Sequence, residues 1–143
     1  MRTLVTRTTI IAIAGASASG KSLFSQTIYN ELVNELEPGA IAIIEEDAYY
    51  KDQSHLPMAH RTQTNYDHPD AFEHALMLEH LTQLRSGNSV EVPTYDYAQN
   101  TRSEKTRRVP AAKILIVEGI LLLSDKALNK EFDIKVFIDT PLD

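Results

Sequence analysis

Eight residues near the start of the chain have the types and spacing of a phosphate-binding loop. The segment Gly15-Ala16-Ser17-Ala18-Ser19-Gly20-Lys21-Ser22 fits the pattern G-x-x-x-x-G-K-[ST]. In such a loop, small residues let successive backbone N–H groups turn toward phosphate oxygens, and the next helix points its positive end at the same place. Lys21 would contact the β- and γ-phosphates and the Ser22 hydroxyl would bind Mg²⁺. The pattern therefore predicts a site for ATP or GTP with Mg²⁺.

Acidic residues follow two apolar runs that come later in the chain. Glu45, Glu46 and Asp47 follow the run at 41–44, and Glu118 follows the run at 114–117. Ligands of open α/β sheets bind beyond the carboxyl ends of the strands, so these acids should lie in the same crevice as the phosphate loop. A small-molecule kinase needs a base for the acceptor hydroxyl and a carboxylate for Mg²⁺. We expect Asp47 and Glu118 to fill these roles.

Other nucleotide-binding classes fit less well. A GTPase needs a separate segment that reads guanine, and the nearest imitation, Asn129-Lys130-Glu131-Phe132, lacks the aspartate of that segment. Large motor ATPases need a longer chain than 143 residues. A small-molecule kinase remains as the interpretation.

The elements that position these residues alternate between strands and helices. Buried strands are expected near 8–13, 41–44, 114–117 and 134–138, with helices at 21–36, 71–86 and 124–129. Asp70 and Glu73 would form the capping pair of the helix at 71–86, and Gly87 would end it. Segments 90–97 and 107–109 suggest a hairpin. This order predicts an α/β fold: a P-loop NTPase-type parallel sheet with helices on both faces and a β-hairpin inserted at 88–110.

Composition limits the class of protein. The 143 residues suit one domain (1–143), and the net charge of −6 disfavours nucleic acid or an anionic membrane as partner. Without cysteine there is no disulfide scaffold, thiolate metal site or cysteine nucleophile. The apolar run at 10–14 is too short for an export signal, although Arg2 and Arg7 precede it and Ala16-Ser17-Ala18 imitates a cleavage site. These features predict a cytoplasmic protein.

Five segments, in this order, resemble the uridine kinase (uridine–cytidine kinase) family. They are the phosphate loop, Asp47-Ala48-Tyr49-Tyr50, Asn65-Tyr66-Asp67-His68-Pro69-Asp70-Ala71-Phe72, Pro93-Thr94-Tyr95-Asp96-Tyr97 and Glu118-Gly119-Ile120-Leu121. The resemblance extends from Thr9 to Asp143. It implies ATP-dependent phosphorylation of the 5′-hydroxyl of uridine or cytidine, a reaction of pyrimidine salvage, by a homo-oligomer, a tetramer in the family.

The resemblance also implies roles for single residues. Asp47 would be the general base near Mg²⁺, and Glu118 would bind the metal with Ser22. Asp67 would hold the ribose hydroxyls. Aromatic and apolar side chains would surround the base, with Tyr95 packed against it and Tyr50, Tyr66, Tyr97 and Ile120 lining the pocket. The distribution of tyrosines agrees in part, since five of the six (49, 50, 66, 95, 97) fall in polar segments, and aromatic faces suit a flat base.

The chain departs from the family pattern at two places. Asn100 occupies the position in the hairpin turn where the family has a histidine that helps to read the pyrimidine edge, which affects base selectivity. The family also continues beyond Asp143 into a helix and an arginine-rich lid. Two alternatives therefore stay open: a related kinase with another acceptor (phosphoribulokinase-like or pantothenate kinase-like), or a nucleotide-binding module with impaired turnover.

The histidines and the basic residues of the hairpin suggest structural or solvated roles. No histidine pair has a recognised zinc spacing, and His74 and His80 are expected on a solvated helix face. The basic cluster of the hairpin is likewise expected to face solvent; it consists of Arg102, Lys105, Arg107 and Arg108.

Overall fold

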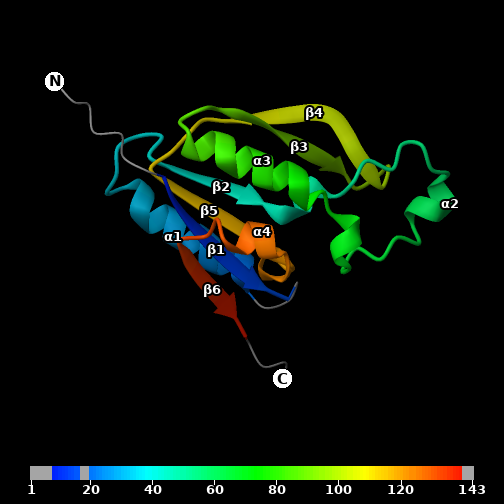
Figure 1. Cartoon of the computed structure of the whole chain (residues 1–143), viewed down its shortest axis with the longest axis horizontal. Helices are drawn as coiled ribbons and strands as arrows, with labels where there is room; N and C mark the ends of the chain where they lie inside the picture. The colour runs from blue at the N-terminus through cyan, green and yellow to red at the C-terminus, as the bar shows by residue number, and fades with distance from the viewer. Residues whose placement is uncertain (1–7, 17–19, 140–143) are drawn as a thin grey trace.

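A four-stranded parallel sheet forms the centre of the molecule. The computed structural model describes residues 8–16 and 20–139. The strands are β1 (Thr9–Gly15), β2 (Ile41–Glu45), β5 (Ile114–Gly119) and β6 (Ile134–Ile138), in the spatial order β2-β5-β1-β6 (Figure 1). Each pairing between them is parallel. The parallel α/β sheet predicted from the four apolar runs is confirmed.

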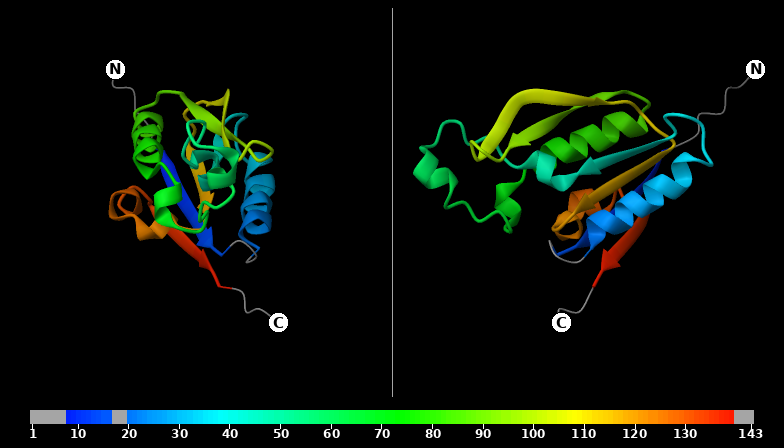
Figure 2. Two further views of the ribbon diagram at one scale, coloured as in Figure 1. Left: turned by 90° about the vertical axis from the view of Figure 1, so that its right-hand side faces the viewer. Right: turned by 180° about the vertical axis from the view of Figure 1, so that it is seen from behind.

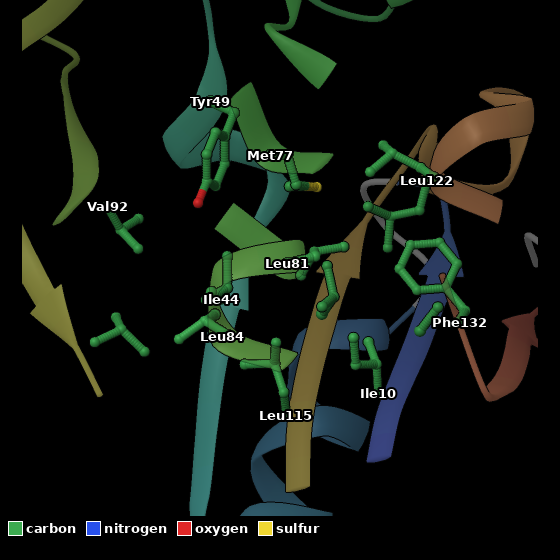
Figure 3. Packing of buried hydrophobic residues seen from close by; sticks show 14 of the residues in the cluster. Ile10, Ile44, Tyr49, Met77, Leu81, Leu84, Val92, Leu115, Leu122 and Phe132 are labelled. Atoms are coloured by element: carbon green, nitrogen blue, oxygen red, sulfur yellow. The ribbon is translucent and has the colours of Figure 1, made fainter. Parts of the chain in front are cut away.

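Helices cover both faces of this sheet. Helix α1 (Lys21–Val33) packs Ile28 and Leu32 against one face, on Ile13 and its neighbours. Helices α3 (His74–Arg85) and α4 (Lys126–Asn129) cover the opposite face, as the left view of Figure 2 shows. Met77, Leu81 and Leu84 of α3 are fully buried there against strand residues, and Figure 3 shows this packing.

The hairpin packs onto the same core. Strands β3 (Val90–Asp96) and β4 (Thr101–Val109) pair antiparallel, with an irregularity between Pro93 and Tyr95. Val92 and Val109 at the base of the hairpin are buried in the cluster that contains Leu84. The predicted hairpin is confirmed, but its second strand begins at Thr101 rather than near Arg107.

The segment between β2 and α3 contains three short helical turns instead of regular elements. These are η1 (Glu46–Tyr49), α2 (Met58–Arg61) and η2 (Pro69–Ala71). In Figure 1 the α2 segment lies away from the sheet, beside the tip of the hairpin, where the Arg61 guanidinium donates to the Gln99 carbonyl (3.0 Å).

The predicted start of the helix at 71–86 is wrong. The helix expected at 71–86 begins at His74, because Phe72 is extended and forms a β-bridge with Tyr50. Asp70 is therefore not its cap; Glu73 is the N-cap residue, without a capping side-chain bond. The predicted stop is confirmed, since Gly87 has a positive φ of 91° just beyond the helix.

Two other helices are shorter than the predicted ranges. Helix α1 ends at Val33, and the expected helix at 124–129 consists of the turn η3 (Leu122–Ser124) followed by α4. The Asp125 carboxylate caps α4 by accepting from the backbone N–H groups of Ala127 and Leu128. Within the described ranges no helix is long and apolar enough to cross a bilayer.

Candidate functional site

The start of α1 presents the cationic part of the predicted phosphate loop. Gly15 ends β1, and Ser17, Ala18 and Ser19 lie outside the described residues. Gly20 precedes α1 with a φ of 88°, a conformation that disfavours any side chain. Lys21 follows as a buried side chain (8% exposed), and the first turn of α1 carries no acidic residue. The positive end of a helix and a buried lysine thus meet at the carboxyl end of β1.

Ser22 and Glu118 are in direct contact. The Ser22 hydroxyl donates to Glu118 Oε1 at 2.5 Å, although the two residues belong to different elements. The contact follows from the topology, because β5, which carries Glu118, pairs with β1, which leads into the loop. Hydroxyl and carboxylate oxygens are ligands that suit Mg²⁺.

The two oxygens fit the way in which kinases hold this ion. Mg²⁺ is commonly bound through one or two carboxylates, waters and substrate phosphates rather than by a cage of protein ligands. Ser22 and Glu118 therefore fit a Mg²⁺ ion that is shared with a nucleotide.

Negative charge accumulates around this contact. Glu45 lies opposite Glu118 in the β2–β5 register, and Asp47 follows two residues later in η1. Burial raises the pKa of Asp47, the neighbouring Glu46 and Glu118 raise it further, and Lys21 opposes the shift. Burial, Glu118 and Asp47 likewise raise the pKa of Glu45. A carboxylate with a raised pKa is a stronger base than an ordinary aspartate, as deprotonation of a hydroxyl requires.

Asp47 lines a cavity that lies between the β2 end of the sheet and the hairpin. The cavity has a volume of about 420 Å³, within the range that small ligands occupy. Its wall combines two carboxylates, one of them the candidate base, with two predicted tyrosines, an arginine, a glutamine, a threonine and apolar residues. These are Gln26, Ile43, Glu45, Asp47, Ala48, Val92, Pro93, Thr94, Tyr95, Tyr97 and Arg107.

The other predicted aromatic residues form a cluster with Tyr95. Tyr50 stacks on Phe72 (ring centroids 4.5 Å apart), and Tyr95 donates its hydroxyl hydrogen to the Tyr66 hydroxyl at 2.8 Å. Ile120 packs against the same cluster. Tyr50, Tyr66 and Ile120 thus contact the aromatic wall and are absent from the lining of the 420 Å³ cavity.

Asp67 and Asn100 do not line the cavity that contains Asp47, the candidate general base. Asp67 is exposed in the segment before η2, and its charge contributes to the raised pKa of Tyr50. Asn100 occupies the hairpin turn with a φ of 48°, which asparagine tolerates better than most residues. Its amide nitrogen lies 3.7 Å from the Met58 sulfur, and its side chain does not line the cavity. The structure therefore groups Asp47 with Tyr95 and Tyr97, and leaves Asn100 apart.

The prediction that His74 and His80 lie on a solvated helix face is wrong. His74 is buried (8% exposed), with Nε2 at 2.7 Å from Glu46 Oε2. His80 is half-buried, with Nδ1 at 2.7 Å from the Tyr49 hydroxyl. The spacing of His74, Met77, Leu81 and Leu84 could have indicated the burial of His74, because these positions share one helix face.

The basic cluster is divided between two environments. Arg102 pairs with Glu73 at 2.9 Å and donates to the Tyr50 carbonyl, whereas Arg107 donates to the Ile43 carbonyl and lines the cavity. Arg102 is half-buried, contrary to the prediction of a solvated face, whereas Arg107 is exposed, as predicted, although it contacts the body of the protein. Lys105 and Arg108 are exposed, as predicted.

Comparisons with known proteins show the family of this chain. Residues 10–143 match the family described as Phosphoribulokinase / Uridine kinase. The chain is 60% identical over 134 residues to a uridine kinase of Tolumonas auensis and 54% identical to that of Haemophilus ducreyi, with 94% of this chain covered in each case. It spans 63% and 62% of the length of these two curated relatives.

Solved structures share the fold at low sequence identity. A protein described as a possible uridine kinase from Bacillus stearothermophilus superposes with a TM-score of 0.75 at 20% identity, covering 99% of this chain and 74% of that one. A D-glycerate 3-kinase from Cryptococcus neoformans gives a TM-score of 0.57 at 20% identity over 81% of this chain and 44% of that one. The fold therefore occurs in kinases named for different acceptors.

Proposed function

Because the chain belongs to the phosphoribulokinase / uridine kinase family, we propose that it phosphorylates the 5′-hydroxyl of uridine or cytidine. ATP or GTP with Mg²⁺ is the phosphoryl donor, and the product is the nucleoside monophosphate of pyrimidine salvage. The observation that carries the proposal is the placement of Asp47, a carboxylate with a raised pKa, in a cavity walled by Tyr95 and Tyr97. Such a cavity offers an aromatic surface for a flat acceptor together with a general base.

In this proposal the phosphate side of the site belongs to β1, α1 and β5. Residues Gly15 to Ser22 bind the nucleotide phosphates, and Lys21 neutralises the charge that develops on the transferred group. Ser22 and Glu118, which touch at 2.5 Å, would hold Mg²⁺, and Asp47 would assist them. Bound there, Mg²⁺ would neutralise negative charge on the nucleotide phosphates.

The acceptor side of the proposed site belongs to η1 and the hairpin. The Asp47 carboxylate takes the proton of the 5′-hydroxyl as the 5′-oxygen forms its bond to the γ-phosphorus. The bond between the γ-phosphorus and the leaving nucleoside diphosphate breaks in the same step. Tyr95 and Tyr97 pack on the base, with Tyr50, Tyr66 and Ile120 supporting that wall. Asp67 holds the ribose hydroxyls, whereas Asn100 stays in the hairpin turn, outside the lining of the cavity.

Turnover of uridine with ATP and Mg²⁺ tests the proposal directly. We expect formation of uridine monophosphate, resolved by chromatography, and a fall in kcat of about 10²- to 10⁴-fold in Asp47→Asn, the range that general-base catalysis supplies. Glu35→Gln, which neutralises an exposed carboxylate after α1, is the matched control and should leave kcat unchanged. Absence of product from both uridine and cytidine would count against the proposal.

Arg107 supports a second candidate acceptor. Its guanidinium lines the cavity that also holds Asp47, and a cation there suits an acceptor with an anionic group, such as a sugar phosphate. Thermal stabilisation by a sugar phosphate or pantothenate with an ATP analogue, and none by uridine, would favour this acceptor class. Binding of ATP and Mg²⁺ by calorimetry without any turnover would instead indicate a nucleotide-binding module.

The oligomeric state and the cellular location are inferred from the family resemblance. We propose a homo-oligomer, a tetramer by resemblance, in the cytoplasm. Sedimentation of the purified chain tests the oligomer, with a monomer at micromolar concentration as the contrary result.

A further inference from the structure

Glu46 is a fully buried carboxylate that lies between the turn that carries Asp47 and the strand that carries Glu118. Its exposed fraction is 0%, whereas acidic side chains are almost never fully buried unless they are paired. It directly precedes Asp47, at the start of the turn that follows β2. None of the roles assigned above uses its side chain.

One oxygen of Glu46 binds the backbone that follows Glu118. Oε1 accepts from the Ile120 N–H at 2.9 Å and from the Leu121 N–H at 3.0 Å. The approach is close because residue 119 is glycine: a Cβ there would lie 2.5 Å from the Glu46 Cβ. The turn after β2 and the turn after β5 are therefore joined through this one carboxylate.

The other oxygen of Glu46 is fixed from the opposite side. Oε2 lies 2.7 Å from His74 Nε2, and His74 Nδ1 lies 3.6 Å from an Asp125 oxygen. The His74 ring also stacks on Phe72, with centroids 5.3 Å apart and planes 3° from parallel. Helix α3 and the cap of α4 thus hold the side chain that joins the two turns.

We propose that Glu46 is a positioning residue that sets the place of Asp47 relative to Glu118. The inference rests on the proposed kinase function, in which these two acids act on the acceptor and on Mg²⁺. Asp47 follows Glu46 in the chain, and Glu118 immediately precedes the glycine against which Glu46 packs. Loss of the Glu46 hydrogen bonds would free the two turns to move apart, and a misplacement of about 1 Å can lower a rate about 100-fold.

Two variants of Glu46 separate positioning from charge. Glu46→Gln keeps an oxygen for the two backbone N–H groups and an amide that can donate to a neutral His74. Glu46→Met keeps the approximate size and removes both acceptors. We expect kcat for uridine within about threefold of the parent in Glu46→Gln and about 100-fold lower in Glu46→Met, with the KM values for ATP and uridine within about threefold in both.

A crystal structure of each variant supplies a readout that does not depend on turnover. In Glu46→Gln the Asp47 and Glu118 carboxylates should keep their places, and in Glu46→Met the turn at 46–49 should move relative to residues 119–121. If Glu46→Met is not folded by circular dichroism, His74→Gln replaces it, because this variant removes the imidazole from Glu46 and should displace the same turn.

The outcomes distinguish the inference from the function on which it rests. An inactive parent chain would overturn the proposed kinase activity, while the crystal structures would still decide whether Glu46 holds the two turns. An active parent with unchanged kcat and an unmoved turn in Glu46→Met would overturn the positioning role. Equal loss of kcat in Glu46→Gln and Glu46→Met would also overturn it, since charge rather than hydrogen bonding would then be responsible.

Discussion

The contact between Tyr49 and His80 shows how burial changes the chemistry of single side chains in this protein. The Tyr49 ring is fully buried, and its hydroxyl lies 2.7 Å from His80 Nδ1. Burial lowers the pKa of His80 below its ordinary value of 6.5, because the charged imidazolium loses hydration. The folded protein therefore favours a neutral His80.

This shift predicts a loss of stability in acid that depends on His80. Above pH 6.5 the imidazole is neutral in both states, and the hydrogen bond to Tyr49 stabilises the fold. Below pH 6.5 the unfolded chain binds a proton that the folded chain resists, so the free energy of unfolding falls as pH decreases toward the lowered pKa. We expect His80→Gln to cost about 1 kcal/mol at pH 7.5 and less at pH 5.

Urea unfolding at the two pH values measures this difference. His60→Gln, which changes an exposed histidine of α2, is the control and should follow the parent at both pH values. A gap between His80→Gln and the parent that widens on acidification would contradict the predicted direction of the pKa shift.

At the scale of elements, the strands were predictable and the segment from Glu46 to Phe72 was not. The strands appear as apolar runs because both faces of the sheet are covered, so that consecutive residues of a strand are buried. The start of α3 depends instead on a bridge between Phe72 and Tyr50, residues that the sequence separates by a polar segment. No local pattern encodes such a pairing.

The candidate site likewise contains residues that the sequence predicted and residues that it did not. The phosphate-loop pattern and the strand ends sufficed to predict that Glu118 would lie in the same crevice as the loop, and Glu118 contacts Ser22 there at 2.5 Å. Glu46 could not be distinguished from Glu45, because the two acids are adjacent and only the turn into η1 directs one of them inward. The position of Asn100 in the family pattern did not predict its backbone conformation, a positive φ of 48° that asparagine tolerates better than most residues.

Arg85 illustrates how one side chain joins several elements. From the last turn of α3 its guanidinium donates to the Thr8 carbonyl at 3.2 Å, to the Glu131 carbonyl and to the Asp133 carboxylate at 3.3 Å. It therefore links α3 to the segment before β1 and to the connection between α4 and β6.

Arg85→Met should destabilise the fold by about 2 kcal/mol, because the two carbonyls lose these donors in a partly buried place. Chemical denaturation measures the change. Arg108→Met, which alters an exposed arginine of the hairpin, should change the free energy of unfolding by less than about 0.5 kcal/mol. Equal effects of the two substitutions would show that the Arg85 contacts contribute nothing specific.

At the scale of the whole molecule, the main sheet and the hairpin depend on one core. Val92 of β3 is 1% exposed and belongs to the same cluster as Ile10, Ile44 and Leu115 of the main sheet. Figure 3 shows Val92 on the side of this cluster away from Ile10 and Phe132. A hairpin that shares its core with the sheet should not unfold separately, and we therefore propose that residues 1–143 form one domain.

Val92→Ala tests this dependence. Removing two buried methyl groups should lower the free energy of unfolding by about 2 kcal/mol, with a single transition. Hydrogen exchange should become faster in β5 as much as in β3, because both strands open only with the whole core. Val33→Ala, which truncates a valine that is 36% exposed at the end of α1, should change neither quantity measurably. Faster exchange confined to β3 and β4 would mean that the hairpin opens independently, and the Tyr95 and Tyr97 wall of the cavity could then move without the sheet that carries Glu118.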